Sequence, residues 1–289
     1  MKSITGSNDE VSTCRTSATN APALVIGPPL PHLAPVPQPL TAPPRIFSDA
    51  RRSAVSRRAT ERQQRSDAAR FIAEDMREEV KERLSFMQVH PTEALIVSNG
   101  TGALAGMLRQ GGAQVTTLSV EQWSGGEPLP AQPADLLLVD TSLATINDLP
   151  GALLHLRGAM KPGGLLIATL IGAGSLPRLR AAMLAAESER AYPRLHPQID
   201  DRTGSALLQR AGFTRQVVDS HTLTVRYRQL STLVSDLRDQ ALGSVLATVP
   251  PPLTRAAWRA AEVAFASMAD ADGKVSERFE LITLTAWKS

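Results

Sequence analysis

The sequence predicts an α/β protein with a doubly wound, mostly parallel sheet. Three observations support this class: short strands and helices alternate from Ala94 onward, the segment 165–171 is apolar throughout, and a Lys161-Pro162-Gly163-Gly164 turn separates a helix from that strand. A strand that helices cover on both faces is a continuous apolar run, and regular strand–helix alternation is typical of parallel sheets. Longer intervals between the last strands favour an antiparallel edge strand.

Residues 1–44 are expected to form a disordered, proline-rich tail, because prolines recur from Pro22 to Pro44. Proline interrupts helices and sheet ladders and favours extended polyproline segments. The tail is either a spacer or a ligand for a proline-recognition module.

Residues 45–90 are predicted to form charged N-terminal helices. The second half carries an apolar stripe at helical spacing, made by Phe71, Ile72, Met76, Val80, Leu84 and Met87. The first half has almost no stripe and is rich in arginine: Arg51, Arg52, Arg57, Arg58, Arg62, Arg65 and Arg70. These arginines form either a solvated face or a surface for an acidic partner.

Residues 91–289 are predicted to form the α/β domain itself, without internal repeats. The expected strands are 93–97, 113–119, 134–140, 165–171, a stretch within 213–227, and 279–287. The expected helices are one ending near 108 and those at 149–160, 176–189, 204–211, 230–242 and 254–268. Between the second and third strands lies only a short link rich in glycine and proline, which leaves no room for a further helix and strand.

The whole-chain composition excludes several classes of protein. The 289 residues are 43% hydrophobic, and no apolar run approaches the roughly 20 residues that cross a bilayer. A net charge of +3 and only 4% aromatic residues argue against nucleic-acid binding. Cys14 is the single cysteine, which excludes a disulfide framework. We expect a soluble cytoplasmic protein without a secretory signal.

Candidate sites are few. Gly100 and Gly102 follow the first predicted strand and precede a helix, where glycine lets the backbone approach a nucleotide closely. The five histidines show no metal-ligand spacing, so no metal site is predicted. The segment 270–273 (Asp-Ala-Asp-Gly) is similar to the start of a calcium loop, but its glycine falls too early, and a tight turn is expected instead.

Several segments together resemble a known superfamily. The run 146–153 with the turn at 161–164 is similar to the region after the fourth strand of class I S-adenosylmethionine-dependent methyltransferases. The segments 45–47, 207–213, 223–227 and 279–287 resemble one branch of it, the respiratory complex I assembly factor family with its arginine hydroxylase member and bacterial relatives. The resemblance to malonyl-carrier-protein O-methyltransferases is more distant.

This resemblance implies a seven-stranded sheet, S-adenosylmethionine as cofactor, and methyl transfer or arginine hydroxylation on a protein substrate. It implies no universal catalytic residue. The cofactor-binding residues that it implies are Ser98, Asn99, Gly100, Thr101, Gly102, Ser119, Glu121, Asp140 and Thr141.

The sequence also departs from the family pattern around that cofactor. Ile96 stands where the first motif has its acid, and Ser98 stands where it has its first glycine. Ser119 replaces the acid that accepts hydrogen bonds from both ribose hydroxyls, with Glu121 as a possible substitute. Ala144-Thr145 replaces a His-Trp pair, and the third strand is expected to be missing.

Three functions follow from these observations. The chain is an S-adenosylmethionine enzyme with an unusual pocket, or a cofactor-free scaffold that binds a protein partner during assembly of a respiratory complex. A nucleic-acid binder that uses the basic stretch 45–70 is the third and least supported. Binding of S-adenosylmethionine discriminates the first two.

Overall fold

The computed structural model describes residues 45–99, 102–187 and 190–289. The tail predicted for 1–44 therefore lies outside the described residues. The helices are α1 (Asp49–Arg62), α2 (Phe71–Phe86), α3 (Ala103–Gln110), the 3-10 helix η1 (Thr141–Thr145), α4 (Leu149–Gly158), α5 (Pro177–Ala185), α6 (Asp201–Arg210), α7 (Leu230–Asp239) and α8 (Arg255–Ala266). The strands are β1 (Glu93–Val97), β2 (Gln114–Leu118), β3 (Ala134–Val139), β4 (Met160–Ile171), β5 (Thr214–Tyr227) and β6 (Val275–Trp287).

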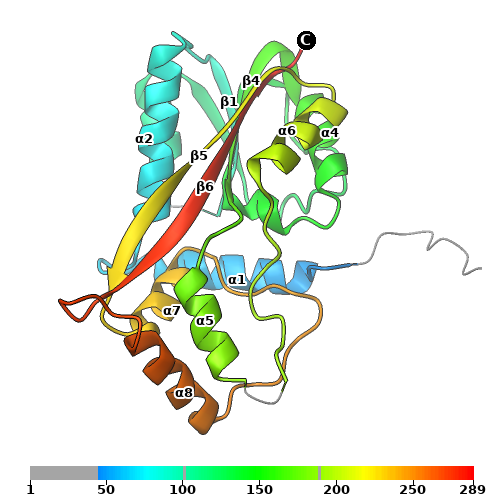
Figure 1. The fold of residues 1–289 in the computed structure, drawn as a ribbon. Coiled ribbons are helices and arrows are strands. Elements are labelled where there is room, and N and C mark those ends of the chain that lie inside the picture. Colours follow the sequence, from blue (N-terminus) through cyan, green and yellow to red (C-terminus); the bar gives the residue numbers. More distant parts are fainter. Residues whose placement is uncertain (1–44, 100–101, 188–189) are drawn as a thin grey trace, which may run out of the picture. The chain divides into compact units, whose positions relative to one another are not determined.

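The six strands form one sheet in the order β2-β1-β3-β4-β6-β5 (Figure 1). The pairs β1–β2, β1–β3 and β3–β4 are parallel, whereas β6 runs antiparallel to both of its neighbours. The doubly wound, mostly parallel sheet is therefore confirmed. The antiparallel edge consists of two long strands, with β5 outermost and β6 one position further in. β2 ends the sheet on the other side, and the link 119–133 that follows it contains no helix or strand.

Helices cover both faces of the sheet, which explains the continuous apolar runs. On one face, Val80 and Leu84 of α2 and Leu108 of α3 pack on Leu136 and Leu138 of β3. On the other face, the helices α4 and α6 pack on the alternate residues of β3 and β4 with Leu153, Leu156 and Leu208. All six residues of β3 are buried or half-buried, as expected for a strand between two helical layers.

Side-chain caps fix where several helices begin. The Asp148 carboxylate accepts a hydrogen bond from the Gly151 amide at 2.9 Å, with Pro150 in the first turn of α4. Asp200 caps α6 by accepting from the Thr203 amide at 2.8 Å. Each cap satisfies an amide that has no partner inside the helix, an effect worth about 1 kcal/mol.

A second apolar core lies beyond the carboxyl end of β4, among α5, α7 and α8 (Figure 1). Leu179 of α5, Leu233 of α7 and Phe265 of α8 pack together there with Phe279 of β6 and Tyr227 of β5. The long strands β5 and β6 thus extend beyond the carboxyl end of β4, where this group of helices packs on them.

Candidate functional site

The turn after β1 is held by a carboxylate at the end of β3. Asp140 Oδ2 accepts hydrogen bonds from Ser98 Oγ at 2.8 Å and from the Asn99 amide at 2.6 Å. Asp140 Oδ1 accepts from the Ser142 amide at 2.9 Å and caps η1. Because β1 and β3 are parallel neighbours, their carboxyl ends bring these predicted site residues together. Asp140 therefore fixes Ser98 and Asn99 with one carboxylate oxygen and the start of η1 with the other.

Gly102 begins α3 with φ of +78°, and a Cβ built there would meet nothing within 4 Å. A left-handed backbone angle with open space around it is what close approach by a ligand requires. Gly100 and Thr101, also predicted for the site, lie outside the described residues.

Ser119 follows the end of β2, at the same edge of the sheet. Its hydroxyl accepts a hydrogen bond from the Glu121 amide at 3.3 Å, and its own amide donates to Gln122 Oε1 at 2.9 Å. The Glu121 side chain is exposed. The strand end where an acid would bind a ribose thus carries a half-buried hydroxyl, and a carboxylate two residues further on.

The link 119–133 is anchored by a tryptophan. Trp123 is 1% exposed, lies in the core with Leu118 and Leu143, and donates from Nε1 to the Glu127 carbonyl at 2.7 Å. A large buried side chain of this kind fixes a short link to the sheet without any strand.

Helix α1 supplies two buried polar residues to the same edge of the sheet. The Arg52 side chain is 4% exposed and donates from Nε to Thr145 Oγ1 at 3.1 Å and from an NH group to the Ser124 carbonyl at 2.9 Å. Ser56 donates to Asn99 Oδ1 at 2.7 Å. Burial lowers the pKa of Arg52, while the carboxylates of Asp49 and Asp140 oppose that shift. No local sequence pattern predicted these contacts, which join segments 43 to 93 residues apart.

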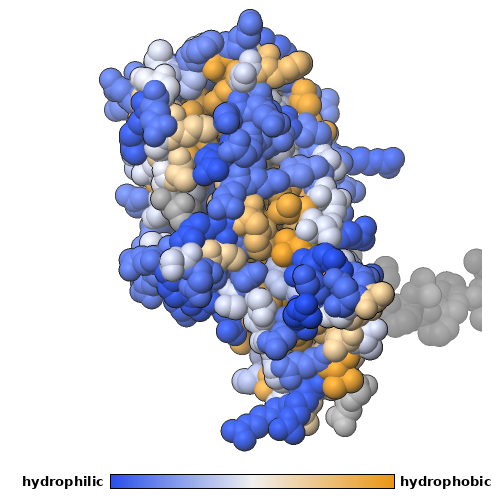
Figure 2. Space-filling view, turned by 90° about the vertical axis from the view of Figure 1, so that its left-hand side faces the viewer, coloured by the Kyte–Doolittle hydropathy of each residue, from blue (hydrophilic) through white to orange (hydrophobic). Residues whose placement is uncertain are grey.

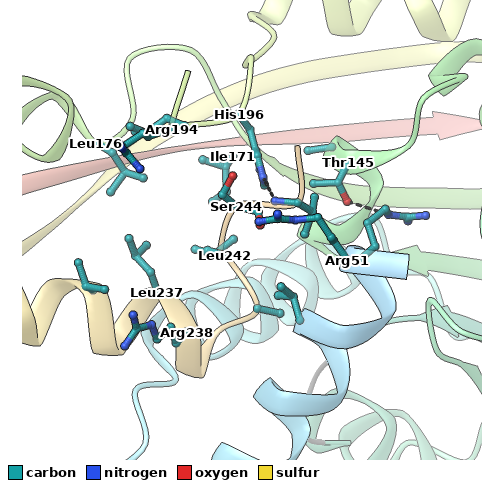
Figure 3. A pocket seen from close by; sticks show the side chains of 18 of the residues that line it. Arg51, Thr145, Ile171, Leu176, Arg194, His196, Leu237, Arg238, Leu242 and Ser244 are labelled. Atoms are coloured by element: carbon teal, nitrogen blue, oxygen red, sulfur yellow. Dashed lines mark hydrogen bonds between the residues drawn. The ribbon is translucent and has the colours of Figure 1, made fainter. Parts of the chain in front are cut away.

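A pocket of about 500 Å³ extends from this edge of the sheet into the second core. At one end, which we call the cofactor end, it is lined by Asn99, Val120, Thr141 and Ser142. At the other end, which we call the chamber, the lining is mostly apolar and comes from α5, α7, α8 and the loops between them: Leu176, Met183, Leu195, Leu237, Leu242 and Trp258 (Figure 3). The pocket also has four lining arginines, Arg51, Arg52, Arg194 and Arg238.

His196 lies on the wall between the two ends. Its Nε2 accepts a hydrogen bond from the Val245 amide at 2.8 Å (Figure 3). Its ring meets that of Phe47 edge to face, with 5.4 Å between the ring centroids. Burial, and then the positive charge of Arg51, lower the pKa of His196 from 6.5 to about 4. A neutral imidazole with its acceptor nitrogen occupied is poorly suited to act as a general base at neutral pH. The contact orders the segment 243–246 instead.

Most arginines of the N-terminal helices have partners within the chain. Arg62 pairs with the buried carboxylate of Asp239 at 2.5 Å, and Arg65 pairs with the same group at 3.4 Å. Arg70 donates to four backbone carbonyls nearby, those of Gln63, Arg65, Ser66 and Ala68. Arg62 and Arg65 therefore fix α1 against α7, a structural role that neither sequence hypothesis included. Arg57 and Arg58 are exposed, as expected for a solvated face.

The segment that is similar to a calcium loop is a structural turn. Residues 270–273 form the tight turn between α8 and β6, where Asp272 accepts a hydrogen bond from Arg226 at 2.6 Å. Among the described residues, no group of three His, Cys, Asp or Glu side chains is placed to hold a metal ion. In the same part of the chain, no helix is long and apolar enough to cross a membrane.

Comparisons with known proteins agree with the resemblance predicted from the motifs. The chain is 28% identical over 165 residues to the rat protein named arginine-hydroxylase NDUFAF5, mitochondrial, covering 56% of this chain and 48% of the relative. It is 32% identical over 162 residues to a malonyl-[acyl-carrier protein] O-methyltransferase of Xylella fastidiosa, covering 55% and 54%. The corresponding protein of Gallionella capsiferriformans is 26% identical over 275 residues, covering 84% and 91%.

These alignments are partial, and no family model matches the chain. The chain spans about half the length of the arginine-hydroxylase relatives that it matches. Among solved structures, a Burkholderia thailandensis 1,6-didemethyltoxoflavin-N1-methyltransferase with S-adenosylhomocysteine has a TM-score of 0.43 at 16% identity, covering 89% of this chain and 94% of that chain. A Haemonchus contortus phosphoethanolamine N-methyltransferase 2 with S-adenosyl-L-methionine has a TM-score of 0.39 at 15% identity, covering 72% and 52%. Because both TM-scores are below 0.5, the fold is assigned from the strand order.

Proposed function

We propose that this chain, which its sequence relatives place in the class I S-adenosylmethionine-dependent methyltransferase superfamily, binds S-adenosylmethionine at the cofactor end and an acceptor in the chamber. The residues that would hold the cofactor are Ser98, Asn99, Gly100, Thr101, Gly102, Ser119, Glu121, Asp140 and Thr141. The observation that carries the proposal is the continuity of the pocket, which runs from Asn99 and Thr141 to Trp258.

The residues present fit the cofactor in part. The left-handed backbone angle and open space at Gly102 suit close approach of a ligand, and Asp140 fixes Ser98 and Asn99. At the ribose position, Ser119 offers a neutral hydroxyl, and charge-assisted hydrogen bonds are the stronger kind. We therefore expect binding that is weaker than that of a site with an acid at this position.

The bound cofactor would supply an electrophilic methyl group. The chain's own residues would position the acceptor in line with that group and exclude water, and such positioning accounts for much of the rate of this kind of reaction. The apolar chamber walls suit water exclusion, and no residue is assigned a role in proton transfer.

A cofactor-free scaffold that binds a protein partner, for example during assembly of a respiratory complex, is the second candidate. The observation in its favour is that polar groups of the cofactor end already bond to one another. Asn99 Oδ1 accepts from Ser56, both oxygens of Asp140 are occupied, and Arg52 spans Thr145 and Ser124. A ligand would have to compete with these bonds.

Calorimetric titration of the full chain with S-adenosylmethionine, together with a thermal-shift series, separates the two candidates. A ligand that binds only the folded state raises the melting temperature with the logarithm of its excess over Kd. We expect measurable heat and a rising melting temperature in the micromolar to millimolar range. The absence of both at millimolar ligand would overturn the enzyme proposal and favour the scaffold.

A matched pair of glycine variants identifies where the ligand binds. Gly102→Val should weaken binding by about tenfold or more, because a β-branched residue resists φ of +78° and fills the open turn. Gly112→Val is the control, since Gly112 has φ of +93° and the same open space but follows the C-cap residue of α3 and does not line the pocket. Equal binding by both variants would place the cofactor elsewhere.

A further inference from the structure

We propose that the chamber binds an amphipathic organic anion, that is, a small molecule or acyl group with an apolar body and an anionic head. The inference deepens the proposed function, because this ligand would be the acceptor, but its binding needs no cofactor. It rests on the lining of the pocket, on the balance of charge around it, and on the state of His196.

The apolar body is matched by the chamber walls. Leu176 approaches the pocket from one side and Leu237 and Leu242 from the other (Figure 3). Met183 of α5 and Trp258 of α8 also line it. Burial of an alkyl or aromatic group there contributes about 25 cal/mol per Å² of apolar surface removed from water. The pocket volume of about 500 Å³ is within the usual range of small-molecule sites.

The anionic head is matched by an excess of positive charge. Four arginines line the pocket, whereas none of the described lining residues is an aspartate or glutamate. Two of the four have carboxylate partners close by: Arg194 pairs with Glu187, and Arg52 lies 3.7 Å from Asp49.

The other two lining arginines are not neutralised by any ion pair recorded among the described residues. Among the described residues, the Arg51 side chain donates to the Ser244 carbonyl at 3.0 Å, and the Arg238 side chain on α7 is exposed. Positive charge beside low-dielectric walls raises the local concentration of anions. Arg51 and Arg238 are therefore the residues we assign to the anionic head.

The low pKa of His196 is due in part to the same positive potential. The charge of Arg51 contributes to the low pKa of this ring, so the wall of the pocket disfavours a further cation. A guanidinium or ammonium group entering the chamber would meet Arg51 and lose its hydration without gaining a carboxylate. An arginine side chain, the acceptor indicated by the name of the arginine-hydroxylase relatives, therefore fits this chamber poorly.

Apolar areas on the outer surface give a weaker alternative. The face in Figure 2 is mostly hydrophilic, and polar side chains separate the apolar areas on it. Among the described residues, the chamber combines an apolar lining with arginines that have no ion pair.

Three small molecules that differ in charge and in apolar body test the inference by calorimetry on the full chain. Decanoate has the apolar body and the anionic head, decylammonium has the body with the opposite charge, and malonate has negative charge without the body. We expect one decanoate per chain, bound about tenfold or more tightly than either other probe, because only decanoate can combine apolar burial with a charge-assisted bond. Equal or tighter binding of decylammonium would overturn the inference, as would malonate binding as well as decanoate.

Two variants and a control locate the anionic head. Arg51→Gln and Arg238→Gln should each reduce decanoate affinity by several-fold to about tenfold, since each removes one charge beside the chamber. Arg238→Gln is included because the Arg238 side chain is exposed, so this change should leave the fold intact. Arg58→Gln removes an exposed charge from α1 and should have no effect. Unchanged affinity in both test variants would contradict the assignment.

The result is independent of the cofactor titration. Decanoate binding without S-adenosylmethionine binding would support the chamber ligand and refute the enzyme proposal. S-adenosylmethionine binding without decanoate binding would do the reverse.

Discussion

The two ends of the pocket differ in how their polar groups are satisfied. At the cofactor end, Asp140, Asn99 and Arg52 all bond to other groups of the chain. In the chamber, Arg51 and Arg238 stand beside apolar walls without a carboxylate. The comparison shows that the lining arginines without a carboxylate partner lie at the chamber, whereas the polar groups of the cofactor end are already ordered by internal contacts.

Helix α1 is common to both ends, since Arg52 and Ser56 face one and Arg51 and Val55 line the other. Its position depends on Asp239 of α7, which is 2% exposed and also accepts a hydrogen bond from the Ala69 amide at 3.1 Å. Changes at this anchor should therefore affect both ends together.

The largest expected effect comes from Asp239→Asn. The change leaves Arg62 and Arg65 without their shared carboxylate, and breaking a buried ion pair in this way typically costs about 3 to 5 kcal/mol. Urea unfolding should show this loss in the free energy of unfolding. Asp67→Asn is the control, because that side chain is 81% exposed and pairs only with Arg65, so its loss should stay below about 1 kcal/mol. Similar losses in both variants would show that α1 is not anchored through Asp239.

The second-largest effect is expected in the pH dependence of the free energy of unfolding, through His196. The folded protein holds the His196 pKa near 4, below the ordinary 6.5, so the unfolded chain takes up the proton first as the pH falls. Stability from this group is complete above about pH 6.5 and is lost as the pH falls through 4, by about 3 kcal/mol in total. His196→Gln should remove this dependence while keeping an acceptor for the Val245 amide.

The measurement is urea unfolding of the native protein and of His196→Gln at pH 7.5 and pH 4.5. The difference between the two proteins cancels the titration of other groups. A constant difference at both pH values would contradict the neutral state of His196.

A smaller effect, in the opposite direction, is expected from Ser119→Asp. An acid at the end of β2 would give the ribose hydroxyls a charged acceptor and raise S-adenosylmethionine affinity by about tenfold, or about 1.4 kcal/mol. Thr117→Asp places the same charge at an exposed position of the same strand and should not change affinity. Calorimetry of both variants checks this, and an equal gain in both would indicate a general effect of charge.

The smallest effect is expected from Arg57→Gln. This side chain is exposed on α1, and no ion pair is recorded for it among the described residues, so the free energy of unfolding should change by less than about 0.5 kcal/mol. Ligand affinity at either end should also stay the same. A large loss of stability would show that the exposed arginines have a structural role as well.

Local patterns were sufficient to predict much of the fold. The apolar runs gave β3 and the second half of β4, and the helical stripe gave α2, because burial by neighbouring layers leaves a periodic trace in the sequence. The missing strand between β2 and β3 followed from the length of the link alone. The turn 161–164 proved to lie within the irregular start of β4, since Gly163 with φ of +75° bends the chain without ending the strand.

The site was predicted only in part. Ser98, Asn99 and Asp140 do meet, because parallel strands end at one edge of the sheet. Arg52, Ser56, His196 and the chamber walls could not be found in this way. Their contacts depend on how α1 and the loops around α5 and α7 pack over long sequence separations, which no local spacing records. The cofactor role of the predicted residues is still a prediction.

Strand β6 belongs to both apolar cores. Its residues Ile282, Leu284 and Ala286 pack in the core of the main sheet, while Val275 and Phe279 pack among α5, α7 and α8. From Val275 to Glu280 the only pairing partner of this strand is β5. The two regions therefore share one continuous hydrogen-bonded ribbon, and we expect them to unfold as a single cooperative unit, with slow amide exchange extending along β6 from one core into the other.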